Sequence, residues 1–69
     1  MRIKDIIYTN MYKNRTPVII YGYAQDRTEF TLLHKNRFND YRDVPQVLLN
    51  ETVFAWRIRE NVIEISYIK

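Results

Sequence analysis

Few side chains in this sequence could take part in catalysis. His34 is the only histidine and Ser66 the only serine, and both fall within segments that we expect to be β-strands. A serine nucleophile needs a base beside it and a carboxylate behind that base, and no carboxylate has an obvious place near these two residues. We therefore interpret His34 as a side chain near a strand end rather than as a general base.

The sequence offers equally little to a metal ion or a cofactor. Without cysteine it cannot form disulfides or thiolate zinc sites, and with a single glycine it cannot form a glycine-rich phosphate loop. Asp40 and Asp43 are close in sequence, but we interpret them as a turn residue and a helix cap rather than as metal ligands. We predict no catalytic residue, no cofactor and no metal site, and expect that the protein is not an enzyme.

Basic and aromatic residues are interleaved in two segments without a hydrophobic period, residues 8–15 and 35–43, which we expect to be loops. Tyrosine and arginine are enriched in protein-binding hot spots, and the same mixture can stack on bases and pair with phosphates. We predict a partner-binding surface made of these loops. Its candidate residues are Tyr8, Tyr12, Lys13, Arg15, Arg37, Phe38, Tyr41 and Arg42.

The composition describes one small globular domain over residues 1–69. Hydrophobic residues make up 46% and charged residues 28% of the chain, and the net charge of +3 permits phosphate contacts without requiring them. A chain of this size buries only about 60% of the surface that it exposes when unfolded. We find neither a membrane-spanning apolar run nor a signal-peptide pattern, so we expect no membrane contact and a cytoplasmic location.

The clearest element is a C-terminal hairpin with a turn at Glu60-Asn61. Residues 52–59 and 62–68 both alternate between apolar and polar positions, as strands with one buried face do. A two-residue turn fixes the register, and side-chain chemistry favours the same register. The predicted pairs are Ile58 with Ile63, Trp56 with Ile65, Phe54 with Tyr67 and, on the other face, Arg57 with Glu64. We expect Trp56 to be buried in the core.

The remaining segments predict a first hairpin and a short helix. Residues 17–23 and 28–34 form the expected strands, with Val18 and Ile20 facing inward beside Phe30 and Leu32. Asp43-Val44-Pro45 begins a helix of about two turns that Asn50 ends. The spacing of Ile3, Ile6 and Ile7 predicts a turn of helix, although a short edge strand is an alternative. The predicted fold is α+β: an antiparallel sheet of two hairpins with one short helix between them.

Four stretches of the sequence carry a resemblance: KDII near the start, TPVIIY, DVPQVLLNETVFAW and VIEISYI. The chain resembles short accessory proteins encoded by phages and prophages of low-GC Gram-positive bacteria. The resemblance implies a small protein that binds and disables a host factor, such as CRISPR or restriction machinery. The leading hypothesis is therefore binding to a host or phage protein.

Two alternatives to this hypothesis remain open. One is nucleic-acid or nucleotide binding through the same basic aromatic loops. The other is a homodimer that buries Ile19, Tyr21 and Tyr23 against a symmetry mate, which would also enlarge a small core.

Overall fold

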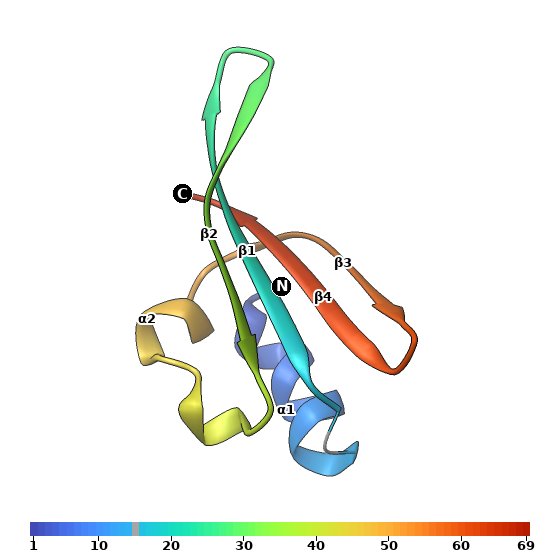
Figure 1. Cartoon of the computed structure of the whole chain (residues 1–69). Helices are drawn as coiled ribbons and strands as arrows, with labels where there is room; N and C mark the ends of the chain where they lie inside the picture. Colours follow the sequence, from blue (N-terminus) through green and yellow to red (C-terminus); the bar gives the residue numbers. More distant parts are fainter. Residues whose placement is uncertain (15) are drawn as a thin grey trace.

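A computed structural model of the chain describes residues 1–14 and 16–69. The elements in chain order are α1 (Ile3–Asn14), β1 (Val18–Asp26), β2 (Glu29–Phe38), the 3₁₀ helix η1 (Tyr41–Asp43), α2 (Gln46–Leu49), β3 (Val53–Arg59) and β4 (Val62–Ile68). The strands form one sheet, and both α-helices pack on the same face of it (Figure 1). The α+β prediction is confirmed.

The sheet is mixed rather than antiparallel throughout. Its strand order is β2-β1-β4-β3, and the two central strands, β1 and β4, run parallel to each other. The prediction of a purely antiparallel sheet is therefore wrong at this central pair. Ile63 and Ile65 give β4 a fully buried face, whereas β3 carries Arg57 and Arg59 and lies at an edge, where charged residues are tolerated.

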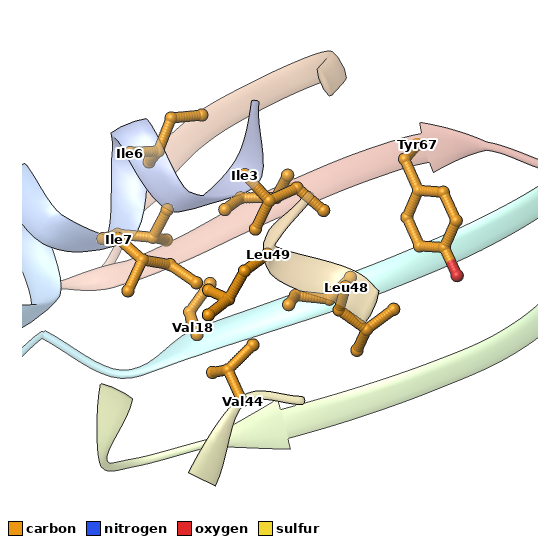
Figure 2. Close-up of a cluster of buried hydrophobic side chains, with 11 residues drawn as sticks. Ile3, Ile6, Ile7, Val18, Val44, Leu48, Leu49 and Tyr67 are labelled. Atoms are coloured by element: carbon orange, nitrogen blue, oxygen red, sulfur yellow. The ribbon is translucent and has the colours of Figure 1, made fainter. Parts of the chain in front are cut away.

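The core lies between the sheet and the helices (Figure 2). Val18 and Ile20 of β1 and Ile63 and Ile65 of β4 are fully buried, as the sequence predicts for the first two. The helices and their flanking turn contribute Ile3, Ile6, Ile7, Val44, Leu48 and Leu49. Among the described residues, none of the buried side chains is polar or charged apart from the hydroxyl of Tyr67.

The N-terminal segment is a helix, which decides against an edge strand. Ile3, Ile6 and Ile7 all face the core, and the helix continues to Asn14 through the first predicted loop. Asp5 accepts a hydrogen bond of 2.8 Å from the Arg2 backbone N–H, a contact that favours the start of a helix. The predicted two-turn helix shortens to the single turn of α2, with Val47 69% exposed.

The second hairpin has the predicted turn and, for most of its length, the predicted register. Glu60 and Asn61 adopt φ of 52° and 63°, and Arg57 pairs with Glu64. The predicted pairing of Phe54 with Tyr67 is wrong, because an irregularity between Val53 and Ala55 brings Val53 opposite Tyr67 instead.

The first hairpin differs more from the prediction. Its strands are longer than expected, and a register shift between Gly22 and Tyr23 pairs Gly22 with His34 and Tyr23 with Leu32. Cross-strand partners share a face of the sheet, so Leu32 lies on the face that the helices leave uncovered. The expectation that Phe30 and Leu32 join the core is wrong.

Candidate functional site

The two predicted binding loops are largely regular structure. Tyr8 is an exposed residue of α1, Tyr12 and Lys13 belong to the same helix, and Arg15 falls outside the described residues. Helix formation continues through residues 8–14 because the buried isoleucines hold this segment against the sheet. The loop prediction is wrong for these residues.

The second predicted loop is divided between β2 and η1. Arg37 and Phe38 end β2, where Arg37 Nε donates to Asn39 Oδ1 at 3.2 Å and Phe38 packs against the core. Tyr41 and Arg42 belong to η1, and Arg42 forms a 2.7 Å ion pair with Asp40. These residues therefore belong to a strand end and a 3₁₀ helix rather than to a loop, although η1 lies in contact with α1.

A different set of side chains stands out as unburied. Six large apolar residues of β2 and β3 are each between 42% and 61% exposed. Two of them, Phe30 and Phe54, are in contact, with ring centroids 5.8 Å apart. This contact joins the far end of the first hairpin to the beginning of β3. We call the set the apolar stripe: Phe30, Leu32, Leu33, Phe54, Trp56 and Ile58.

The partial exposure of Trp56 corrects the expectation that it is a core residue. It pairs with Ile65 and so shares the helix-covered face, but β3 is an edge strand (Figure 1) and Trp56 is 42% exposed. Ile58, opposite the fully buried Ile63, is 55% exposed for the same reason. The sequence pattern identifies the face of a strand correctly but does not show how far the helices extend over that face.

The uncovered face of the sheet carries a polar network centred on Glu64. Arg57 Nε donates to Glu64 Oε1 at 2.8 Å, and the Tyr21 hydroxyl donates to Glu64 Oε2 at 3.1 Å. The hydrogen bond from Arg57, with that from Tyr21, holds the pKa of the Glu64 carboxyl below its usual range. Partial burial, together with the bond to Glu64, raises the pKa of Tyr21.

An open groove of about 470 Å³ lies beside this network. Lys35 Nζ, from β2, lies 5.6 Å from the centre of the Tyr21 ring, a cation–π distance. The groove therefore combines aromatic rings with one carboxylate and a guanidinium. Its lining residues are Tyr21, Tyr23, Ala55, Trp56, Arg57, Glu64 and Ser66.

His34 and Ser66 lie on opposite faces of the sheet. His34 is opposite Gly22 on the helix-covered face, where its Nε2 is hydrogen-bonded to the Tyr67 hydroxyl and Asn36 Nδ2 lies 3.2 Å from its Nδ1. Burial, the larger cause, raises the pKa of Tyr67. Ser66 lines the groove on the other face, so the histidine and the serine do not form a catalytic pair.

Within residues 1–14 and 16–69, no cluster of three histidine, aspartate or glutamate side chains is placed to hold a metal ion. None of the helices described is both long and apolar enough to cross a bilayer.

The apolar stripe had one signal in the sequence that could have been used. Phe54, Trp56 and Ile58 share their strand with Arg57 and Arg59, and such a mixture is typical of an edge strand rather than a central one. The contact of Phe54 with Phe30 had no such signal, because the two residues belong to opposite edge strands of the sheet.

Comparisons of this chain with protein-family models, curated proteins and solved structures found no match.

Proposed function

We propose that this protein is a non-enzymatic module that binds another protein through the apolar stripe. The observation that carries the proposal is the contact between Phe30 and Phe54, which brings exposed apolar groups of two separate strands together. Exposed apolar groups bordered by polar residues are typical of protein-binding sites, where aromatic side chains supply much of the affinity. Arg57 and Arg59, on the opposite face of β3, border the stripe.

The partner class follows from the sequence resemblance alone. A phage-type accessory protein would bind a host or phage protein, and inhibition of a host defence system such as CRISPR or restriction is the form of activity that we propose. A binding module of this kind acts in fixed ratio to its target and needs no catalytic groups. The proposal is thus independent of where His34 and Ser66 lie.

Capture from a lysate of a low-GC Gram-positive bacterium tests this proposal, with nuclease added to remove nucleic acid. The tagged wild-type protein should retain one partner protein in fixed ratio. The double variant Phe54→Ser, Ile58→Ser should lose that partner while remaining folded, because both side chains are more than half exposed. Val47→Ser removes a still more exposed apolar group from α2 and should retain the partner.

The same capture tests the surface expected from the sequence. Tyr8→Ala together with Arg37→Ala removes two exposed members of that surface from different elements. We call the double variant Phe54→Ser, Ile58→Ser the stripe variant. If the Tyr8→Ala, Arg37→Ala variant loses the partner and the stripe variant retains it fully, the proposal is contradicted and the partner binds the surface expected from the sequence.

Nucleic-acid binding is the second candidate, and the uncovered sheet face favours it more than the predicted loops do. Tyr21 and Tyr23 lie there between Lys35 of β2 and Arg57 of β3. Bases can stack on such rings while cations contact phosphates, and the affinity would then fall steeply with salt. Binding of a fluorescent single-stranded oligonucleotide that weakens with added salt and is lost in Lys35→Glu would support this candidate. A flat salt response would exclude it.

A further inference from the structure

The outer edge of β3 already accepts a strand at one end. The Val53 backbone N–H donates to the Met1 carbonyl at 2.8 Å, and the Ile3 N–H donates to the Glu51 carbonyl at 3.0 Å. Between them Arg2 and Thr52 form an antiparallel bridge. In the part of the chain that the structure describes, no residue pairs with this edge beyond Val53, so the rest of β3 presents an unpaired edge.

The register of the second hairpin shows which backbone groups point outward. In a hairpin with a two-residue turn, the pair next to the turn exchanges both hydrogen bonds, and such pairs then alternate along the strands. Arg59 is the residue next to the turn, so Arg59 and Arg57 direct their backbone groups toward β4. Trp56 and Ile58 therefore direct their N–H and C=O groups to the outside.

The side chains of this free edge are divided by charge. Trp56 and Ile58 share one face with Ile65 and Ile63, and Arg57 and Arg59 lie on the other. Arg57 uses its Nε for Glu64 but its side chain is 64% exposed, and no ion pair with Arg59 is found among the described residues. A strand added here would meet apolar groups on one face and two arginines on the other.

We infer that β3 captures an extended partner segment in which apolar and acidic residues alternate. The apolar residues would cover Trp56 and Ile58, the acidic residues would face Arg57 and Arg59, and the outward backbone groups would supply hydrogen bonds. This inference rests on the proposed function and adds to it the mode of binding and the chemistry of the partner.

A second copy of this chain suits the edge poorly. If two β3 strands pair antiparallel with the symmetry axis at Ile58, Arg57 of one copy lies opposite Arg59 of the other. If the axis is at Arg57, the two copies of Arg57 lie opposite each other. Both arrangements are unfavourable, because like charges repel. Pairing about Trp56 instead places Arg59 against Val53, where Met1 already accepts the Val53 N–H. The arginines and the N-terminal residues together disfavour self-pairing and leave the edge open to a segment of opposite charge.

The fluorescence of Trp56, the only tryptophan, gives a direct assay. The probe is a capped synthetic peptide of alternating valine and glutamate, and the matched peptide carries lysine in place of glutamate. We expect saturable binding of the glutamate peptide and much weaker binding of the lysine peptide. Arg59→Glu should weaken binding of the glutamate peptide about fivefold and strengthen binding of the lysine peptide. Lys69→Glu, with the same change of net charge away from β3, should leave both affinities unchanged.

Two variants at one position separate backbone pairing from side-chain contact. Ile58→Pro removes an outward N–H without touching a bond to β4, and proline is tolerated on such an edge. It should weaken peptide binding about tenfold. Ile58→Thr keeps the N–H and should weaken peptide binding much less than Ile58→Pro does. Circular dichroism should show the same fold for both variants.

Three results with the peptides would overturn the inference. They are the absence of saturable binding at millimolar peptide, equal affinity for the two peptides, and equal effects of Ile58→Pro and Ile58→Thr. A concentration-dependent dimer in light scattering that Ile58→Pro abolishes would overturn it in favour of a second copy. If the peptide fails but the stripe variant still loses the captured partner, strand addition is wrong and the proposed function stands. If the stripe variant retains that partner, the proposed function itself is wrong.

Discussion

At the scale of single residues, Glu64 connects three strands of the uncovered sheet face. Its two carboxylate oxygens accept hydrogen bonds from Tyr21 of β1 and Arg57 of β3. Surface ion pairs contribute little to stability in general, so the significance of this one is local. It fixes the orientation of an arginine that borders the apolar stripe.

The lowered pKa of Glu64 predicts a pH dependence. A carboxylate whose folded pKa is depressed stabilises the fold above its unfolded pKa, and this contribution is lost as the pH falls through the folded value. The stability should therefore decline on the acid side of 4.5, the ordinary value for glutamate. Arg57→Met removes the main cause, so the pKa of Glu64 should rise toward 4.5, as an NMR titration of its carboxyl carbon would show. An unchanged pKa would contradict this account.

A side chain added at Gly22 should have a steric cost, which a double-mutant cycle with His34 can measure. A Cβ on Gly22 would overlap the His34 ring, whose Nε2 is bonded to the Tyr67 hydroxyl. Gly22→Ala should lower the free energy of unfolding by about 1–3 kcal/mol, as overpacking does. In the background of His34→Ala the same change should cost much less, because the overlapping ring is absent. Equal costs in the two backgrounds, by chemical unfolding, would show that the ring is not the obstacle.

This contact also shows where residue-level prediction ends. Placing His34 over Gly22 requires the register shift in the first hairpin. A glycine inside a strand often marks such a shift, but it does not show which residue of the partner strand comes to lie opposite. The sequence interpretation of His34 as a strand side chain without a catalytic partner needs only the strand. The hydrogen bond between His34 and Tyr67 could not be predicted. It joins β2 to β4, and these strands come close only because β1 and β4 pair in parallel.

At the scale of elements, the position of β3 at the sheet edge determines what its apolar residues do. Trp56 and Ile65 are opposite one another, but Ile65 is fully buried and Trp56 is not. Trp56→Ala should therefore lower the free energy of unfolding by about 1–2 kcal/mol, less than for a core residue. Ile65→Ala should lower it by about 2–5 kcal/mol. Chemical unfolding of the two variants compares these costs, and a larger loss for Trp56→Ala would restore Trp56 to the core.

The elements differ in how well the sequence predicts them. The second hairpin is predictable because Glu60-Asn61 sets the turn and Arg57 opposite Glu64 agrees with the same register. The first hairpin is not, since Ile19 and Tyr21 make the second face of β1 apolar as well. The sequence pattern underestimates the length of α1, because residues 8–14 have little periodicity of their own and owe their helical structure to the packing of Ile3, Ile6 and Ile7.

At the scale of the whole molecule, a small chain leaves much of its sheet uncovered. One three-turn helix and one single turn cover only one face of four strands, and the extents of 38 × 25 × 19 Å reflect a hairpin that projects beyond the core (Figure 1). The α+β class follows from the local patterns. The mixed topology does not, because it depends on which strand of the second hairpin joins β1, and that choice depends on packing.

The same topology divides the basic aromatic segments among regular elements. Segments that are rich in basic and aromatic residues and lack a hydrophobic period are reasonable binding candidates when the core is unknown. In the structure, most residues of these segments belong to helix α1 and strand β2. The apolar stripe arises from three-dimensional placement, since Phe30 and Phe54 are distant in sequence and meet only in the folded chain.

Residue-resolved amide exchange, with and without the partner recovered by capture, tests the central claim most directly. We predict that the partner slows exchange in residues 30–33 and 54–58, and most strongly at Trp56 and Ile58, whose N–H groups point outward in the free protein. Exchange in α2 should not change. Slowing confined to Tyr8 and residues 37–42, with none in β3, would contradict the claim and place the partner on the surface that the sequence alone suggested.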